Sequence, residues 1–144
     1  MKIIFDYNRT IFDPETNELY PGVFELLRYL QPNHELFLVS RNEPDRLKRF
    51  ETFGLTNIFK KVYFVPEKNL ELFKKISNNE KNTFVIGDSL NDEIKIGNTL
   101  GFLTIRIKQG KFKDVKPTST DEIPNFELNN IESIRDLIEK YEKN

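Results

Sequence analysis

Short apolar runs alternate with segments of helical periodicity along most of this 144-residue chain. The apolar runs predict strands at residues 2–5, 35–39, 62–65, 83–86 and 102–107, and a short one at 126–128. Apolar residues three and four positions apart predict helices at 23–30, 43–53, 70–76, 94–100 and 131–141. Repeated β-then-α units form a parallel sheet with helices on both faces. We therefore expect an α/β fold, a three-layer α/β/α sandwich with a parallel, Rossmann-like sheet.

Three segments refine this expectation. Residues 10–20 are too polar for a helix and have a turn-rich centre, which predicts a small β-hairpin after the first strand. Pro44 suits the first turn of the helix at 43–53, and Gly54 suits its end. Residues 108–124 are polar and contain two prolines, so we expect a surface loop. The length predicts a single domain, residues 1–144.

Two acidic motifs follow predicted strands. Asp6-Tyr7-Asn8-Arg9-Thr10 comes directly after residues 2–5, and Gly87-Asp88-Ser89-Leu90-Asn91-Asp92 comes directly after residues 83–86. Ligands of open α/β sheets bind in the crevice at the carboxyl ends of the strands. Carboxylates at the ends of two neighbouring strands would face each other there. Because Mg²⁺ prefers one or two carboxylates together with water and phosphate oxygens, the motifs predict a magnesium site.

The composition excludes several classes of function. The chain has 22 basic and 23 acidic residues and a net charge of -1, so it has no basic excess for nucleic-acid binding. It has no cysteine, which excludes disulfides, thiolate catalysis and cysteine-ligated zinc. No apolar stretch approaches the ~18 residues typical of a membrane span, and the N-terminus has no signal-peptide core. We expect a cytoplasmic protein that binds neither nucleic acid nor membrane.

Four motifs, in order, resemble those of the haloacid dehalogenase-like (HAD) hydrolase superfamily. The first is an aspartate motif ending in threonine, Asp6 to Thr10. The second is a serine at the end of the second long strand, Ser40. The third is a lysine near the start of the next helix, which Lys68 fits best, and the fourth is Gly87-Asp88 with Asp92. The resemblance extends from Asp6 to the last helix.

The resemblance implies a role for each matching residue. Asp6 would be the nucleophile that forms an aspartyl-phosphate and would also bind Mg²⁺. Asn8 would offer its backbone carbonyl to the metal, Asp88 would be a further ligand, and Asp92 would complete the metal group or orient Lys68. Ser40 and Lys68 would hold the transferred phosphoryl group. The expected substrate is a phosphorylated compound, small or macromolecular.

Asn8 departs from the pattern of the family's phosphatases. They carry an aspartate at this position as the general acid and base, and an amide cannot transfer protons. Since such help is typically worth ~10²–10⁴ in rate, we expect a slow phosphatase that favours good leaving groups such as acyl or aryl phosphates. The alternative is a catalytically impaired domain that binds a phosphate or a partner.

We expect no cap domain, because only the predicted hairpin lies between Thr10 and the first helix. In this family an open site suits a large substrate, or a protein partner or second copy that completes it.

Some assignments have competing interpretations. Ser40 could simply lead into a helix, Asp92 could favour a helix start by its charge, and Lys60 or Lys61 could be the site lysine instead of Lys68. A phospho-receiver domain would need an aspartate at the end of the strand at 62–65, where the sequence has none. A dinucleotide-binding enzyme would need Gly-x-Gly-x-x-Gly after the first strand, and it is missing.

Overall fold

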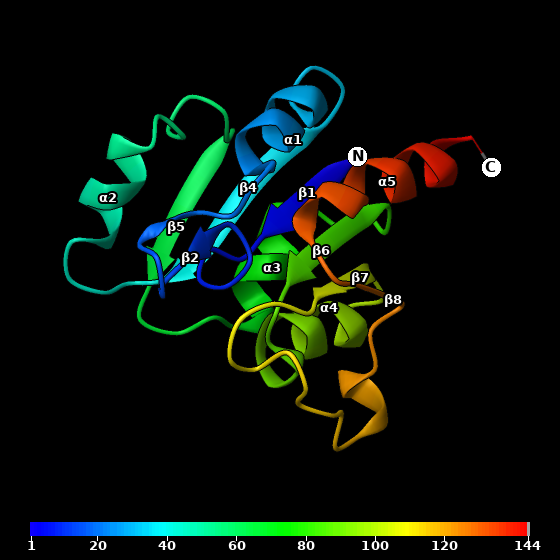
Figure 1. The fold of residues 1–144 in the computed structure, drawn as a ribbon. Coiled ribbons are helices and arrows are strands. Elements are labelled where there is room, and N and C mark those ends of the chain that lie inside the picture. Colours follow the sequence, from blue (N-terminus) through cyan, green and yellow to red (C-terminus); the bar gives the residue numbers. More distant parts are fainter. Residues whose placement is uncertain (144) are drawn as a thin grey trace.

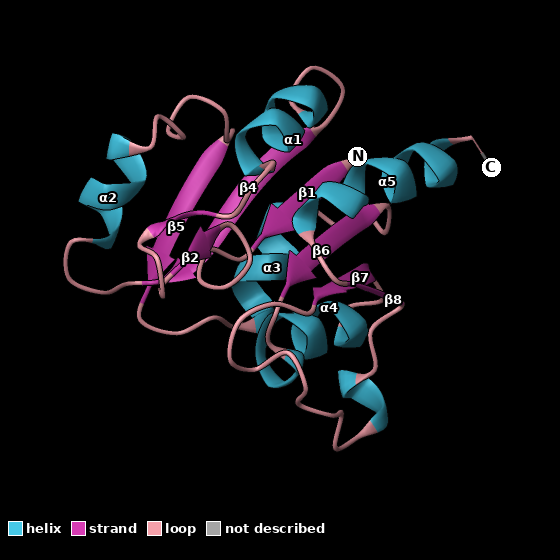
Figure 2. Ribbon diagram, in the orientation of Figure 1, coloured by secondary structure: helices cyan, strands magenta, loops and turns pink. Residues whose placement is uncertain are grey.

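The protein has a six-stranded parallel sheet between two layers of helices (Figures 1 and 2), as seen in a computed structural model that describes residues 1–143. The strand order is β5-β4-β1-β6-β7-β8, and every neighbouring pair is parallel. The strands are β1 (Lys2–Phe5), β4 (Glu35–Arg41), β5 (Lys61–Val65), β6 (Thr83–Gly87), β7 (Leu103–Ile107) and β8 (Phe126–Leu128). This architecture confirms the predicted α/β fold.

The chain winds in both directions from the central strand β1. It first builds β4 and β5 on one side, then crosses back through α3 (Leu70–Ser77) and builds β6, β7 and β8 on the other. The carboxyl ends of β1, β4 and β6 therefore meet where the strand order reverses. In open α/β sheets this switch point is where ligands bind.

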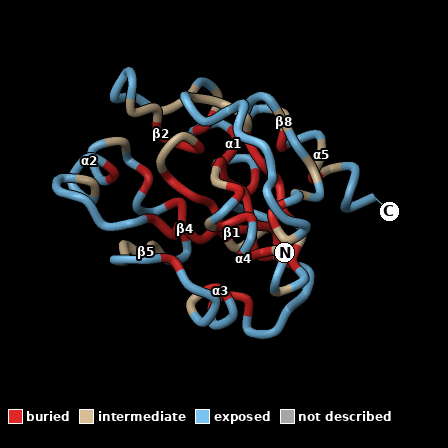
Figure 3. Tube along the Cα trace, turned by 90° about the horizontal axis from the view of Figure 1, so that it is seen from below, coloured by how far each residue is buried: buried red, intermediate tan, exposed pale blue. Residues whose placement is uncertain are grey.

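Two apolar cores fill the space between the layers. Ile3 and Phe5 of β1 point to the face that is covered by α1 (Val23–Leu30), α2 (Arg46–Thr52) and α5 (Ile134–Glu142). Ile4 points to the opposite face, which is covered by α3 and α4 (Lys95–Thr99). This alternation follows from the two-residue period of a strand. Figure 3 shows buried stretches along β1 and β4 near the centre and many exposed residues on the helices around them.

The turns between elements agree with the sequence in most places. The predicted hairpin is present as β2 (Phe12–Asp13) and β3 (Glu18–Leu19), which pair antiparallel. Gly54 and Gly101 have φ of 74° and 77° and follow α2 and α4. No helix within residues 1–143 has the length and apolar character needed to cross a bilayer.

The predicted start of the helix at residue 43 is wrong. The helix α2 begins at Arg46, because Asn42 still donates a hydrogen bond to the Val65 carbonyl at 2.8 Å and so continues the sheet. The chain then turns through Asp45, whose φ of 63° lies in the left-handed region. Pro44 therefore lies in a turn ahead of the helix.

Candidate active site

A pocket of about 230 Å³ lies at the carboxyl ends of β1, β4 and β6. Its walls include both predicted acidic motifs and Lys68. Three arginines also line it, namely Arg9, Arg41 and Arg46. The parallel register produces this gathering, because Phe5 of β1 is level with Leu38 of β4 and with Ile86 of β6. Asp6 and Asp88 therefore leave the sheet on neighbouring strands, as the sequence predicts.

Asp6 is held at the end of β1 by the tight turn that follows it. Its backbone N–H donates to the Ile86 carbonyl at 2.9 Å. The Tyr7 carbonyl accepts from the N–H groups of residues 10, 11 and 12, and Arg9 adopts a left-handed φ of 60°. This turn brings the Thr10 hydroxyl back to donate to Asp6 Oδ2 at 3.3 Å. Asp6 is buried, and its carboxylate orientation is fixed by these contacts.

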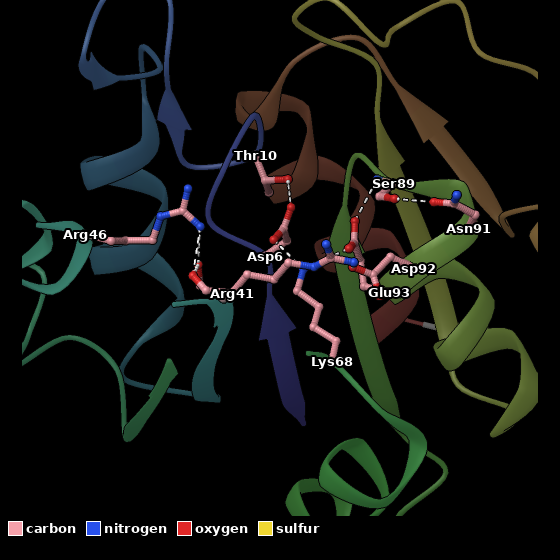
Figure 4. A network of polar contacts seen from close by, with 10 residues as sticks. Asp6, Thr10, Arg41, Arg46, Lys68, Ser89, Asn91, Asp92 and Glu93 are labelled. Carbon is pink, nitrogen blue, oxygen red and sulfur yellow. Dashed lines mark hydrogen bonds and ion pairs between the residues drawn. The ribbon is translucent and has the colours of Figure 1, made fainter. Parts of the chain in front are cut away.

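Lys68 is the lysine that reaches Asp6 (Figure 4). Its ammonium donates to Asp6 Oδ1 at 2.6 Å and to Glu93 Oε1 at 2.9 Å. Burial alone would lower the pKa of Lys68, but the charges of Asp6 and Glu93 outweigh it and the pKa is raised. Lys60 instead pairs with Glu35, and Lys61 lies over the Tyr63 ring. Of the three candidate lysines, only Lys68 can contact a group bound at Asp6.

Glu93 is a central site residue that the sequence does not predict, and the three arginines of the pocket are not predicted either. Glu93 is buried and accepts from Lys68 and, through Oε2, from the Ser89 N–H at 2.7 Å. Gly87 leaves room for it, since a side chain at that position would overlap the Glu93 carboxylate. The carboxylate that orients Lys68 is therefore Glu93, and not Asp92.

A π-helical turn explains this shift from Asp92 to Glu93. In an α-helix, residues four apart share a face, so Asp88 and Asp92 would lie together. Here Leu90–Ile94 is π-helical, and the Ile94 N–H donates to the Ser89 carbonyl five residues back at 3.3 Å. The wider turn brings position 93 toward the strand end. Asp92 lies at the pocket wall and pairs with Arg41 at 3.5 Å.

Asp6, Asp88 and Glu93 form a group of carboxylates suited to a cation. One oxygen of each lies within 4.8 Å of the others. Burial raises the pKa of Asp88, and the charges of Asp6 and Glu93 raise it further. Burial also raises the pKa of Glu93, and Asp6 adds to that effect. A hard divalent cation would offset the repulsion among these buried carboxylates. Because Mg²⁺ also prefers oxygen ligands, these residues fit Mg²⁺.

Of the two remaining predicted residues, Asn8 and Ser40, only one lines the pocket. Asn8 lines the pocket. Ser40 is buried at the end of β4, where its hydroxyl donates to the Arg41 carbonyl at 3.1 Å and accepts from Arg46 Nη1 at 3.1 Å. In the described part of the chain, Ser40 is not among the residues that line the pocket. Its phosphoryl-binding role stays a prediction, and its hydroxyl is already hydrogen-bonded to Arg46.

Comparisons with known proteins agree with the fold and with the resemblance that the motifs predict. A sequence profile of the HAD-hydrolase-like family matches residues 67–134, which include Lys68, Asp88 and Glu93. The HAD-hydrolase YfnB of Bacillus subtilis is 26% identical over 138 residues, covering 88% of this chain and 57% of YfnB. In sequence and in fold the chain is similar to the haloacid dehalogenase-like hydrolase superfamily. This similarity agrees with the resemblance of the four motifs.

A further relative matches about half of the chain. The glyceraldehyde 3-phosphate phosphatase of Methanopyrus kandleri is 27% identical over 78 residues, covering 54% of this chain and 34% of that protein. The chain thus spans about a third to somewhat over half of the length of these curated relatives.

Solved structures share the fold and, in two cases, contain the metal. Magnesium-bound YfnB superposes with a TM-score of 0.70 over 84% of this chain and 56% of YfnB. The D,D-heptose 1,7-bisphosphate phosphatase of B. bronchiseptica, complexed with magnesium and phosphate, has a TM-score of 0.77 at 11% identity. It covers 97% of this chain and 98% of that one. At that identity the second match shows the fold alone.

Proposed function

We propose that this chain is a Mg²⁺-dependent phosphate monoester hydrolase that forms an aspartyl-phosphate on Asp6. The observation that carries the proposal is the buried contact of Lys68 with both Asp6 and Glu93, beside Asp88. It combines a carboxylate nucleophile, a cation for phosphoryl oxygens and a carboxylate group that fits Mg²⁺. The names of the two relatives, a phosphatase and a HAD hydrolase, support the same class.

Each residue has a distinct part in the proposal. Asp6 and Asp88, with the Asn8 carbonyl, would hold the metal, which would neutralise phosphoryl charge when bound. Asp6 attacks phosphorus, and the ester oxygen leaves with the substrate's organic group. Lys68 holds a phosphoryl oxygen as charge develops, and Glu93 keeps its ammonium aimed at Asp6. Thr10 fixes the attacking carboxylate by its hydrogen bond to Oδ2.

Asn8 sets the expected rate. Its side chain cannot protonate the leaving oxygen or activate water, so both the formation and the hydrolysis of the aspartyl-phosphate lack general acid-base help. We expect slow turnover, with acyl and aryl phosphates as the best substrates because their leaving groups need little protonation. The same observation favours a second candidate, a domain of this family that binds a phosphorylated ligand or partner without turning it over.

Phosphate release from an aryl phosphate in the presence and absence of Mg²⁺ tests the proposal. The parent chain is compared with Asn8→Asp and with Asp6→Ala, which removes the nucleophile. Slow Mg²⁺-dependent release by the parent, raised about 10²–10⁴-fold by Asn8→Asp and abolished by Asp6→Ala, supports the hydrolase. Activity only in Asn8→Asp supports the binding domain, and release that persists in Asp6→Ala refutes the proposed nucleophile.

A further inference from the structure

A second pocket, of about 390 Å³, opens directly beside the candidate active site. Asp88, Ser89 and Phe112 line both pockets, so the two adjoin. The second pocket lies at the end of β6 and β7, under the loop of residues 108–118 that is yellow in Figure 1. Its volume is in the range of small-molecule sites. A phosphoryl group at Asp6 could therefore carry an organic group that extends into it.

Arg106 forms the floor of this second pocket with an unsatisfied donor. It is level with Gly87 on β6 and Glu127 on β8, and only 2% of it is exposed. Its Nη1 donates to Glu127 at 3.0 Å and its Nη2 to the Phe112 carbonyl at 3.1 Å. Within residues 1–143 its Nε has no acceptor. Buried donors are nearly always paired, so this one favours a ligand with an oxygen acceptor.

Glu122 provides the complementary acceptor. It is buried in the wall of the same pocket, and its Oε1 accepts from the N–H and the hydroxyl of Thr118 at 3.0 and 3.1 Å. Its Oε2 has no hydrogen bond among the described residues. A hydroxyl group both donates and accepts, so an array of hydroxyls can satisfy Glu122 and Arg106 together. The charge of Arg106 is already balanced by Glu127, which disfavours a second anionic group.

The loop supplies an apolar wall that is fixed relative to Asp6. Phe112 is 44% exposed and faces the Arg9 guanidinium at 4.7 Å, and Val115 also lines the pocket. Gln109 donates to the carbonyls of Arg9 and Thr10 at 3.3 and 3.1 Å, which ties the loop to the turn after Asp6. An aromatic ring beside polar groups suits the C–H face of a carbohydrate.

We propose that this second pocket binds the organic group of a sugar or polyol phosphate and so selects the substrate of the proposed hydrolase. The proposal rests on the proposed function for its reaction, but the pocket can be tested by binding alone. Glu122 and Arg106 would recognise hydroxyls, and Phe112 would cover the carbon chain. In the reaction the P–O ester bond breaks, the phosphoryl group passes to Asp6, and the ester oxygen leaves as an alkoxide that takes its proton from water at the open side of the pocket, since Asn8 cannot supply one.

Two probes that differ only in hydroxyls test this selection. Sorbitol 6-phosphate and n-hexyl phosphate share a six-carbon chain, and kcat/KM is measured for both and for acetyl phosphate as a small reference. We expect the parent to favour sorbitol 6-phosphate over hexyl phosphate at least tenfold, and Glu122→Gln to remove about a tenfold preference. Equal kcat/KM for both six-carbon substrates in the parent would overturn the proposal.

The loop is tested with a matched pair of phenylalanines. Phe112→Ala should lower the ratio of kcat/KM for sorbitol 6-phosphate to that for acetyl phosphate about tenfold. Phe24→Ala is the control, because Phe24 is 40% exposed and lies on α1, away from both pockets. It should leave the ratio and the activity unchanged, and thermal unfolding checks that each variant is folded. An unchanged ratio in both Phe112→Ala and Glu122→Gln refutes the pocket.

A calorimetric titration separates this proposal from the hydrolase itself. If no variant releases phosphate, the proposed function fails, and binding of sorbitol 6-phosphate to the parent is then compared with binding to Glu122→Gln. Affinity about tenfold weaker in Glu122→Gln supports the pocket without hydrolysis. Absent binding, or equal affinity in the two proteins, overturns it.

Discussion

Replacing Glu93 by glutamine tests whether the buried carboxylates form a magnesium site. Glu93 accepts from Lys68 at 2.9 Å and from the Ser89 N–H at 2.7 Å, and glutamine can keep only one of these contacts. The amide also removes a negative charge from beside Asp6 and Asp88. Loss of a group that supports metal ligands typically weakens metal affinity 10–100-fold. We expect this loss of Mg²⁺ affinity in Glu93→Gln.

The effect on stability follows from linkage. At a Mg²⁺ concentration about 100 times the parent's Kd, binding stabilises the parent by about 2.7 kcal/mol. A Kd that is 10–100-fold weaker leaves about 1.4 to 0.4 kcal/mol at the same concentration. For a domain of this size, the parent's Tm should rise on the order of 5–10 °C with Mg²⁺, and the rise in Glu93→Gln should be half of that or less.

The metal-free variant supplies the internal control. Burial, and then the charge of Asp6, raise the pKa of Glu93, so its charged form is disfavoured in the metal-free fold. Neutral glutamine removes that penalty, and in EDTA the variant should melt close to the parent. Asp92→Asn is the matched variant, and it should keep the full Mg²⁺ shift because Asp92 lies outside the carboxylate group. A full shift in Glu93→Gln together with a lost shift in Asp92→Asn would refute the reasoning.

Three further predictions concern the same buried groups. In the first, the metal-free protein should lose free energy of unfolding, measured by urea, as the pH rises above the ordinary carboxyl pKa of about 4. The reason is that the pKa values of Asp88 and Glu93 are raised in the folded state, so the fold favours their protonated forms. Mg²⁺ should abolish this fall. A stability that rises with pH in EDTA would contradict this. Lys68→Met leaves Asp6 and Glu93 unpaired and should cost about 3–5 kcal/mol in urea unfolding, as well as phosphate release. If Lys68→Met released phosphate at the parent's rate, Lys68 could not be the residue that holds the phosphoryl oxygen. Gly87→Ala should displace the Glu93 carboxylate, cost about 1–3 kcal/mol and weaken Mg²⁺ binding in a calorimetric titration, so unchanged affinity would contradict the packing.

The sequence predicts most of the sheet because its central strands are buried on both sides. Apolar runs such as 83–86 are typical of strands in a parallel sheet that is covered on both faces. The glycines after α2 and α4 have the positive φ that ends a helix. The sequence does not predict where α2 begins. Asn42 stays hydrogen-bonded to β5, and nothing in the local sequence reports that tertiary contact.

The site was predictable where it depended on strand ends and not where it depended on helix geometry. Asp6 and Asp88 follow strands directly, so their proximity follows from the parallel register. Glu93 depends on a π-helical turn that displaces the expected four-residue spacing by one position. Its signal was the glycine at position 87, whose missing side chain makes room for a buried carboxylate.

The second pocket could not be found from the sequence because it is built by a polar loop. Residues 108–124 have neither the strand nor the helix period, which predicts a surface loop. The structure agrees that most of this segment is irregular, with one short 3₁₀ turn at Thr120–Glu122. Yet Glu122 is buried and Gln109 bonds to the turn after Asp6, contacts that depend on partners about a hundred residues away or on the loop's own fold.

Detection of a phosphoryl group on Asp6 tests the central claim most directly. Because Asn8 cannot activate water, the aspartyl-phosphate should accumulate when the chain is mixed with acetyl phosphate and Mg²⁺, quenched in acid and mapped by mass spectrometry. The account predicts Mg²⁺-dependent phosphorylation at Asp6, a lower level with faster phosphate release in Asn8→Asp, and none in Asp6→Ala. Phosphate release by the parent without any label on Asp6, or a label on another residue, would contradict it.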